Sequence, residues 1–393
     1  MKTNNEYKMK GALMGASVLL APLSVLAHES HENSANGSNA LVTALTDDSA
    51  FFRIDPSLTL RLTHGSTTFS EGFEVGGHDP SDDGFNFQGF EVSASIYAGD
   101  HIAGFVNTNI FKLDGEEFES EFEEGFLKLQ NLPGNFELRG GRMLVRFGDQ
   151  NAKHQHAFDF VNSNIGNLRF LGEEGLAIEG GEISWLLPTA VDDILSVSLG
   201  SAVPHEEEEG EESEADEFGE SALPIDDIVT ARYQARFGLN DFHRFQVGGS
   251  FVTGENGFGR TTKIYGADVT YTWRQNGLES GGQQLRWRNE WIMRDVEDGE
   301  GGFKGNSFNT NLLWEFAESW EAGLRYDYVE GLAQAELAER FRISTSLAKR
   351  FDLGDDFVGL VRLQYDHDDL RGDGTEDSVW LQFGFDWGGS EVR

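Results

Sequence analysis

The sequence contains no cysteine and only 7 prolines among its 393 residues. Disulfide bonds therefore contribute nothing to its stability, even in an oxidising compartment. Cationic side chains are also scarce, because 30 lysines and arginines stand against 68 acidic residues and the formal net charge is −38. Such a chain is a poor ligand for DNA or RNA, whose phosphates are bound by lysine and arginine. We therefore exclude nucleic acid as a partner.

Long hydrophobic runs are missing everywhere except at the N-terminus. Residues 1–27 carry three lysines, then an apolar run, and end in Val25-Leu26-Ala27. The run is short and Pro22 interrupts it, which argues against a membrane anchor. A basic start, a short apolar core and a small-x-small end are typical of a cleavable secretory signal peptide. We therefore predict export, and we leave this segment out of the fold.

The rest of the chain is a succession of stretches in which apolar and polar residues alternate. In the last of them one face is apolar and aromatic, with Val379, Leu381, Phe383, Phe385 and Trp387. The intervening residues include Gln382, Gly384 and Asp386. A period of two indicates a strand with two different faces. Because lipid accepts only helices and closed barrels, the pattern predicts an all-β fold, a transmembrane antiparallel β-barrel.

We count about 16 strands, with boundaries uncertain by about two to four residues. The predicted ranges are 56–64, 85–99, 102–113, 117–129, 135–146, 174–187, 192–202, 228–239, 243–253, 261–274, 284–296, 304–317, 319–328, 338–349, 356–366 and 376–387. The barrel thus covers 56–387, after a partly disordered periplasmic segment at 28–55 and before a tail at 388–393. The connections alternate between short turns and longer acidic or glycine-rich loops, as in bacterial outer-membrane barrels. An even strand number places both chain ends in the periplasm, so we predict location in the outer membrane of a Gram-negative bacterium.

The loop 147–173 is unusually apolar for a connection, since it holds several phenylalanines and aliphatic residues. Such a loop is poorly suited to water. We expect it to fold into the mouth of the barrel, pack on the wall and narrow the channel.

The same loop contains the most compact set of metal-ligand residues, His154, His156 and Asp159. Imidazole with carboxylate suits zinc or another divalent cation, although the fold requires no cofactor. The alternative is that both histidines simply hydrogen-bond the backbone. The acidic block within 206–220 should repel itself and stay disordered, and it offers divalent cations a bridge to lipopolysaccharide.

Arginines recur on the polar faces of the later strands. They are Arg232, Arg236, Arg286, Arg288, Arg325, Arg340, Arg342 and Arg362. In lipid each would cost about 2–4 kcal/mol at mid-depth, so we predict that they line the pore. Nearby acids such as Glu290 and Asp327 pair with some of them. A surplus of arginine favours anions whereas the acidic loops favour cations, so the sequence leaves the selectivity open.

Residues 137–188 resemble a family of porin-like outer-membrane proteins, some of which are called zinc-regulated or, loosely, TonB-dependent. The matching motifs are Arg139-Gly140-Gly141-Arg142, Arg146-Phe147-Gly148 with Asn151, His154 and His156, Phe170-Leu171-Gly172-Glu173-Glu174-Gly175-Leu176, and Ser184-Trp185-Leu186-Leu187-Pro188. The resemblance implies passage of small solutes and a link to zinc supply, with His154 and His156 as the carried-over residues. It does not imply active transport, because about 28 residues before the first strand leave no room for a plug domain. Phosphate-selective porins share the general plan.

These observations predict a porin for passive or weakly selective diffusion of small hydrophilic solutes or ions. The alternatives are a metal-capturing surface receptor and a phosphate- or anion-selective porin. No spacing of serine, histidine and aspartate singles out a nucleophile with its base, so we do not predict an enzyme. A homotrimer is the expected assembly, although the sequence identifies no trimer interface.

Overall fold

The computed structural model describes residues 51–70, 73–112, 118–203, 219, 221–333, 337–354, 356–389 and 391–392. The predicted signal peptide, most of the segment 28–55 and most of the acidic block at 206–220 lie outside these residues. None of the described helices is long and apolar enough to cross a membrane.

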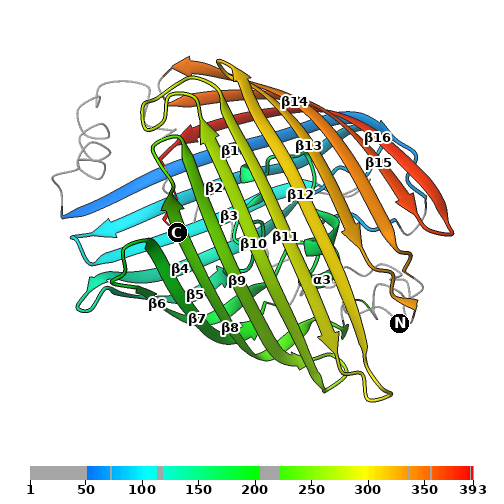
Figure 1. Cartoon of the computed structure of the whole chain (residues 1–393), viewed down its shortest axis with the longest axis horizontal. Helices are drawn as coiled ribbons and strands as arrows, with labels where there is room; N and C mark the ends of the chain where they lie inside the picture. Colours follow the sequence, from blue (N-terminus) through cyan, green and yellow to red (C-terminus); the bar gives the residue numbers. More distant parts are fainter. Residues whose placement is uncertain are drawn as a thin grey trace, which may run out of the picture.

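Sixteen antiparallel strands of the described chain form one closed barrel, in which each strand pairs with its sequence neighbours and β1 pairs with β16 (Figure 1). The strands are β1 (Phe52–Thr67), β2 (Gly84–Ala98), β3 (Ile102–Lys112), β4 (Glu119–Leu132), β5 (Phe136–Leu144), β6 (Ala177–Leu186), β7 (Asp192–Ala202), β8 (Pro224–Gly238), β9 (His243–Asn256), β10 (Thr261–Arg274), β11 (Gln284–Val296), β12 (Phe303–Ala317), β13 (Trp320–Val329), β14 (Arg340–Gly354), β15 (Phe357–Leu370) and β16 (Gly374–Gly388). This confirms the predicted all-β transmembrane barrel.

The boundaries differ from the prediction at a few strands. The barrel begins at Phe52 rather than at residue 56, and β8 begins at Pro224 rather than at 228. The predicted loop 367–375 is mostly strand, because β15 runs to Leu370 and β16 starts at Gly374. Asp and Gly residues made this segment look like a loop, but their backbone groups complete the β15–β16 ladder.

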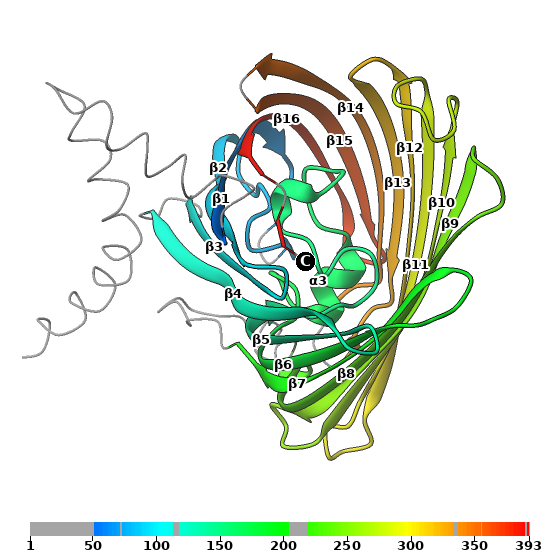
Figure 2. The same cartoon turned by 90° about the vertical axis from the view of Figure 1, so that its left-hand side faces the viewer.

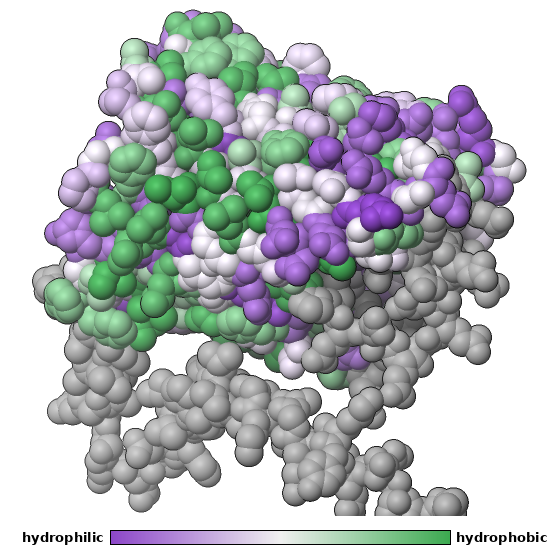
Figure 3. Space-filling view, turned by 90° about the horizontal axis from the view of Figure 1, so that it is seen from below, coloured by the Kyte–Doolittle hydropathy of each residue, from purple (hydrophilic) through white to green (hydrophobic). Residues whose placement is uncertain are grey.

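The outward face of the barrel is apolar. Large side chains on alternate positions are exposed there, among them Trp287, Trp291, Leu312, Leu324, Leu363 and Phe383. In space-filling view hydrophobic residues gather over much of one side of the wall (Figure 3). Burying such a surface in hydrocarbon rather than water is favourable by about 25 cal/mol per Å².

The long connection 147–173 between β5 and β6 folds into the barrel, and we call it the inner loop. It contains a short 3-10 helix, η2 (Gln155–Ala157), and the helix α3 (Ile165–Leu171). All residues of α3 are buried, and the helix lies inside the ring of strands (Figure 2). The predicted position of this loop inside the barrel is thus what the structure shows.

Candidate functional site

The inner loop packs on the barrel wall through its apolar residues. Phe147, Ile165, Phe170 and Leu171 join a buried cluster with wall residues of β3–β6, β8–β11 and β13, such as Ile264. Burying a side chain of this kind stabilises a fold by about 1.5–3 kcal/mol. The lumen is therefore not a uniformly hydrophilic tube, because its inner face carries an apolar belt beneath the loop.

Two wall glycines allow the loop to approach this closely. A Cβ atom on Gly266 would lie 2.7 Å from the ring of Phe147, and one on Gly305 would lie 2.8 Å from the ring of Phe170. Both separations are far below van der Waals contact, so the phenylalanines occupy space that any other residue would fill.

Arginines of the wall bind the polar groups of the same loop. Arg325 donates through Nη1 to the carbonyl of Asn162 at 2.8 Å, and its guanidinium stacks 4.6 Å from the ring centre of Phe160. Arg294 donates to the carbonyl of Arg169 at 3.0 Å. Arg362 donates to the carbonyl of Phe158 at 3.1 Å. Charged donors make strong hydrogen bonds to carbonyls, so the loop is fixed rather than loosely inserted.

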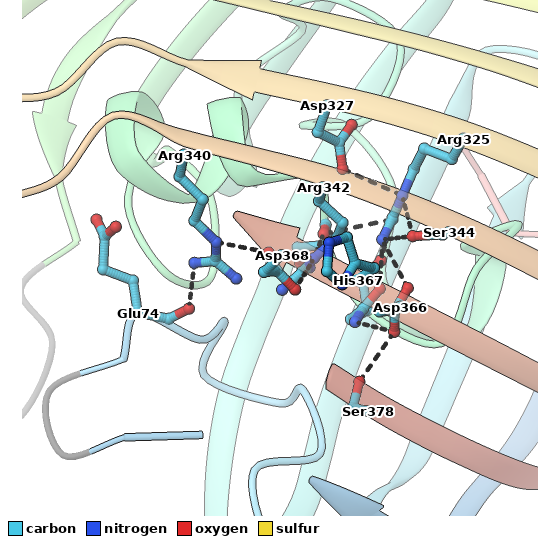
Figure 4. A network of polar contacts seen from close by, with 12 residues as sticks. Glu74, Arg325, Asp327, Arg340, Arg342, Ser344, Asp366, His367, Asp368 and Ser378 are labelled. Atoms are coloured by element: carbon cyan, nitrogen blue, oxygen red, sulfur yellow. Dashed lines mark hydrogen bonds and ion pairs between the residues drawn. The ribbon is translucent and has the colours of Figure 1, made fainter. Parts of the chain in front are cut away.

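A second set of contacts links two further wall arginines to an acid on the neighbouring strand (Figure 4). Arg340 and Arg342 of β14 both donate to Asp368 of β15, at 2.8 and 3.0 Å. Arg340 also donates to the carbonyl of Glu74 at 2.7 Å, which ties the loop between β1 and β2 to this wall. Arg340, Arg342 and Asp368 are almost entirely buried, and their pairing offsets the cost of burying their charges.

Seven of the eight predicted arginines are buried or half-buried in the structure, and most of them contact acids or carbonyls. Arg232 is bound to Asp268, while Arg286 and Arg288 contact Asp159 of the inner loop. Arg236 differs, because its side chain is 60% exposed near the turn that follows β8. The sequence predicted that acids pair with some of these arginines, and the structure shows such pairs for most of them.

The predicted set of metal ligands is not assembled. Asp159 is held by Arg286 and Arg288, whereas His154 and His156 lie against acids of β2 and β4. His154 contacts Glu123 through Nδ1 at 2.8 Å and Glu124 through Nε2 at 3.0 Å. These lengths are those of charge-assisted hydrogen bonds. The expectation that the histidines bind the backbone is also not met, since their partners are carboxylates.

The electrostatics of this contact favour doubly protonated histidines. Burial lowers the pKa of His154, but the charges of Glu123 and Glu124 and their hydrogen bonds outweigh it and raise that pKa well above 6.5. Burial also lowers the pKa of His156, but the neighbouring carboxylates of Glu91 and Glu391 outweigh it, so the pKa is raised. The two imidazoles, stacked with 6.0 Å between ring centres, lie against a strongly acidic wall that favours their protonated forms.

A residue pair that sequence reasoning missed, Glu121 with Glu123, owes its position to an irregularity in β4. In the pairing with β3, Asn107 lies opposite Glu124 but Thr108 lies opposite Phe122, so Glu123 is an extra residue, a β-bulge. Such a bulge re-aims side chains on its strand. Here it brings Glu121, Glu123 and Glu124 to the inward face. The consecutive acids at 123 and 124 break the alternation of the strand, which was the visible signal.

His78, in the loop after β1, faces this acidic wall. Its Nε2 atom lies 3.5 Å from Glu123 Oε1, 3.7 Å from Glu174 Oε1 and 3.8 Å from Glu121 Oε2. Burial lowers its pKa, but the surrounding carboxylates, above all Glu123, raise the pKa to about 9. The sequence signal was weak, because the histidine is isolated among loop residues.

Between the inner loop and the opposite wall lies a small polar cavity of about 30 Å³. Its lining includes Lys153, Asp159, Asn309, Arg288 and Glu290. The interior has two electrostatically different sides. Acids of β2 and β4 face the three loop histidines on one side, and arginines of β11–β15 line the other.

Sequence comparison and structure comparison give different amounts of information about this chain. No protein-family model matches the sequence. An uncharacterized protein of Aquifex aeolicus (strain VF5) is 26% identical over 236 residues, which make up 53% of this chain and 48% of that protein. The chain spans about half the length of the curated relative that it matches.

Solved structures with a similar fold include an anion-selective porin from Comamonas acidovorans, with a TM-score of 0.54 at 12% identity over 86% of this chain and 100% of that one. The outer membrane channel DcaP of Acinetobacter baumannii gives a TM-score of 0.55 at 10% identity over 86% and 97%. OprB of Pseudomonas putida gives 0.55 at 10% identity over 86% and 94%. At these identities the likeness establishes a shared porin-like barrel fold.

Proposed function

We propose that the chain is an outer-membrane porin of a Gram-negative bacterium, which lets small hydrophilic solutes or ions diffuse passively and with weak selectivity. The observation that carries the proposal is a closed barrel of 16 strands with an apolar outer face and a charged inner face. A barrel of this strand number is wide enough for a water-filled lumen, which side chains and an inserted loop then narrow.

The inner loop is the constriction in this proposal, because it occupies the lumen and wall arginines hold it there. Deleting 152–168 should raise the single-channel conductance of the refolded protein in planar bilayers. A matched control shortens the exposed turn at 276–281, which is outside the lumen, and should leave the conductance unchanged. An unaltered conductance in the folded loop deletion would contradict the proposed role.

Weak selectivity follows from the pairing of the interior charges. Since most inward arginines form ion pairs with carboxylates, few of them act on a permeating ion as unpaired charges. The reversal potential across a salt gradient should therefore be small. A strong preference for anions would instead favour the alternative of an anion- or phosphate-selective porin, for which the exposed Arg236 is the nearest candidate.

A homotrimer in contact with lipopolysaccharide belongs to the same proposal, and the mass of the detergent-solubilised protein tests the trimer. The link to zinc or another divalent cation requires a different set of ligands from the one expected, because Asp159 is engaged by Arg286 and Arg288.

A further inference from the structure

The geometry points to a divalent-cation site formed by His78, Glu121 and Glu123, whose ligand atoms lie within 4.8 Å of one another, with Glu174 beside His78, and we propose that it binds a first-row transition cation. The site joins three separate segments. His78 comes from the loop after β1, the two central glutamates come from β4, and Glu174 lies at the end of the connection to β6. The proposal goes beyond the porin function and does not depend on it.

The first argument is the unsatisfied state of the ligand atoms. Neither ring nitrogen of His78 has a hydrogen-bond partner, although its side chain is only 9% exposed. The Oε2 atom of Glu121, which faces it, is buried and also without a partner. A buried polar group without a partner is costly, and a bound cation is one way to satisfy it.

The second argument is the spacing. A tetrahedral ion with ligand bonds of 2.0–2.2 Å separates its ligand atoms by about 3.3–3.6 Å. The Nε2 atom of His78 lies 3.5–3.8 Å from one oxygen each of Glu123, Glu174 and Glu121, close to this separation and too long for ordinary hydrogen bonds. By contrast, both ring nitrogens of His154 and Nδ1 of His156 lie 2.7–3.0 Å from carboxylates, as donors do, while Nε2 of His156 lies 3.5 Å from Glu391 alone.

The third argument is that neighbouring groups occupy the outer oxygens and leave the inner ones for the ion. Arg142 donates to Oε1 of Glu121 at 2.8 Å, which leaves its Oε2 facing His78. His154 and Asn107 contact Oε2 of Glu123, at 2.8 and 2.7 Å, whereas its Oε1 faces His78 and accepts only a longer hydrogen bond from Asn109, at 3.3 Å. Metal-binding carboxylates are commonly fixed by such outer hydrogen bonds.

The fourth argument is a close approach of the backbone. A Cβ atom on Gly77 would lie 2.9 Å from Cγ of Glu174, so the glycine before His78 gives this carboxylate access to the site. One imidazole and two carboxylates, with the carboxylate of Glu174 next to the imidazole, supply nitrogen and oxygen ligands that suit zinc, cobalt, iron or manganese.

Cobalt provides the probe for this site, since Co²⁺ in a four- or five-coordinate environment absorbs visible light. The mature protein, refolded in detergent and stripped with a chelator, should bind one Co²⁺ per chain, and Zn²⁺ should displace it. H78N should weaken binding by at least about 10-fold, since it removes the only nitrogen ligand. The variant E121Q gives a second test should H78N fail to fold.

Two histidine variants serve as controls. His101 lies in the turn after β2, where its ring contacts the carbonyl of Gln130. H101N should bind Co²⁺ like the wild type, and so should H156Q, because His156 contacts Glu91 and Glu391 instead.

Thermal unfolding supplies an independent readout. Co²⁺ should raise the unfolding temperature of the wild type, H101N and H156Q, and should not raise that of folded H78N, since a ligand stabilises only the state that binds it. Absence of saturable Co²⁺ binding by the wild type, or binding that survives H78N and E121Q but is lost in H156Q, would overturn the site. A porin that conducts without binding Co²⁺ would overturn the site alone.

Discussion

At the scale of single residues, the interior is determined by where side chains are absent as much as by where they are present. Gly305 lies under the ring of Phe170, and Gly266 lies under that of Phe147. Each glycine is in a strand and is tolerated there because a ring from the inner loop takes the place of its side chain. This complementarity cannot be inferred from the alternation of strand residues, which reports only the face on which a position lies.

Substituting Gly305 by alanine should therefore loosen the inner loop. The added methyl group would lie 2.8 Å from Phe170, so ring or strand must shift at a cost of about 1–3 kcal/mol. We expect a lower unfolding temperature in detergent and a noisier single-channel current. The matched control is G249A, because nothing lies within 4 Å of a Cβ atom at Gly249. Equal effects of the two substitutions would argue against the packing role.

At the scale of elements, the strands were predictable and their connections were less so. The alternation of apolar and polar residues is a local signal of a strand. In β13, for example, the apolar Leu324 is exposed on the outer face and the charged Arg325 is buried on the inner face. The bulge at Glu123 was harder to foresee, since one extra residue changes the face of all that follows. The acidic cation site was missed for another reason. Its ligands lie far apart in the sequence, and only the folded barrel brings His78 to Glu121.

The C-terminal tail is an element that alternation did not describe. Val392 is 7% exposed and its backbone nitrogen donates to Ser95 Oγ at 3.0 Å. Glu391 lies 3.5 Å from Nε2 of His156 in the inner loop. The described part of the tail therefore turns into the barrel and contacts the loop there.

Replacing Val392 by aspartate should displace this tail. A carboxylate buried in an apolar cluster is costly, so the tail should leave its place and the conductance should rise. The control is V191D, a change at an exposed valine in the turn after β6. If conductance and its noise are the same for V392D as for V191D, the tail does not restrict the lumen.

At the scale of the whole molecule, the apolar outer wall decides where the protein is stable. An arginine at Leu324, which is 51% exposed in the middle of β13, should destabilise the barrel in lipid by about 2–4 kcal/mol. The control is L278R, because Leu278 is 62% exposed in the turn after β10, away from the strands. Unfolding by denaturant in lipid vesicles measures both. A barrel that stays folded and dissolved without detergent would contradict the membrane assignment itself.

The position of α3 also constrains the order in which the chain folds. The helix precedes β11, β12 and β13 in the chain, yet it packs against all three. The seam between β1 and β16 joins residues more than 300 positions apart, so its entropy cost is the largest of any pairing. We therefore expect the strands to pair around α3 first and β1 to pair with β16 last. A refolding intermediate with protected amides in β11–β13 and unprotected ones in β1 would be its signature.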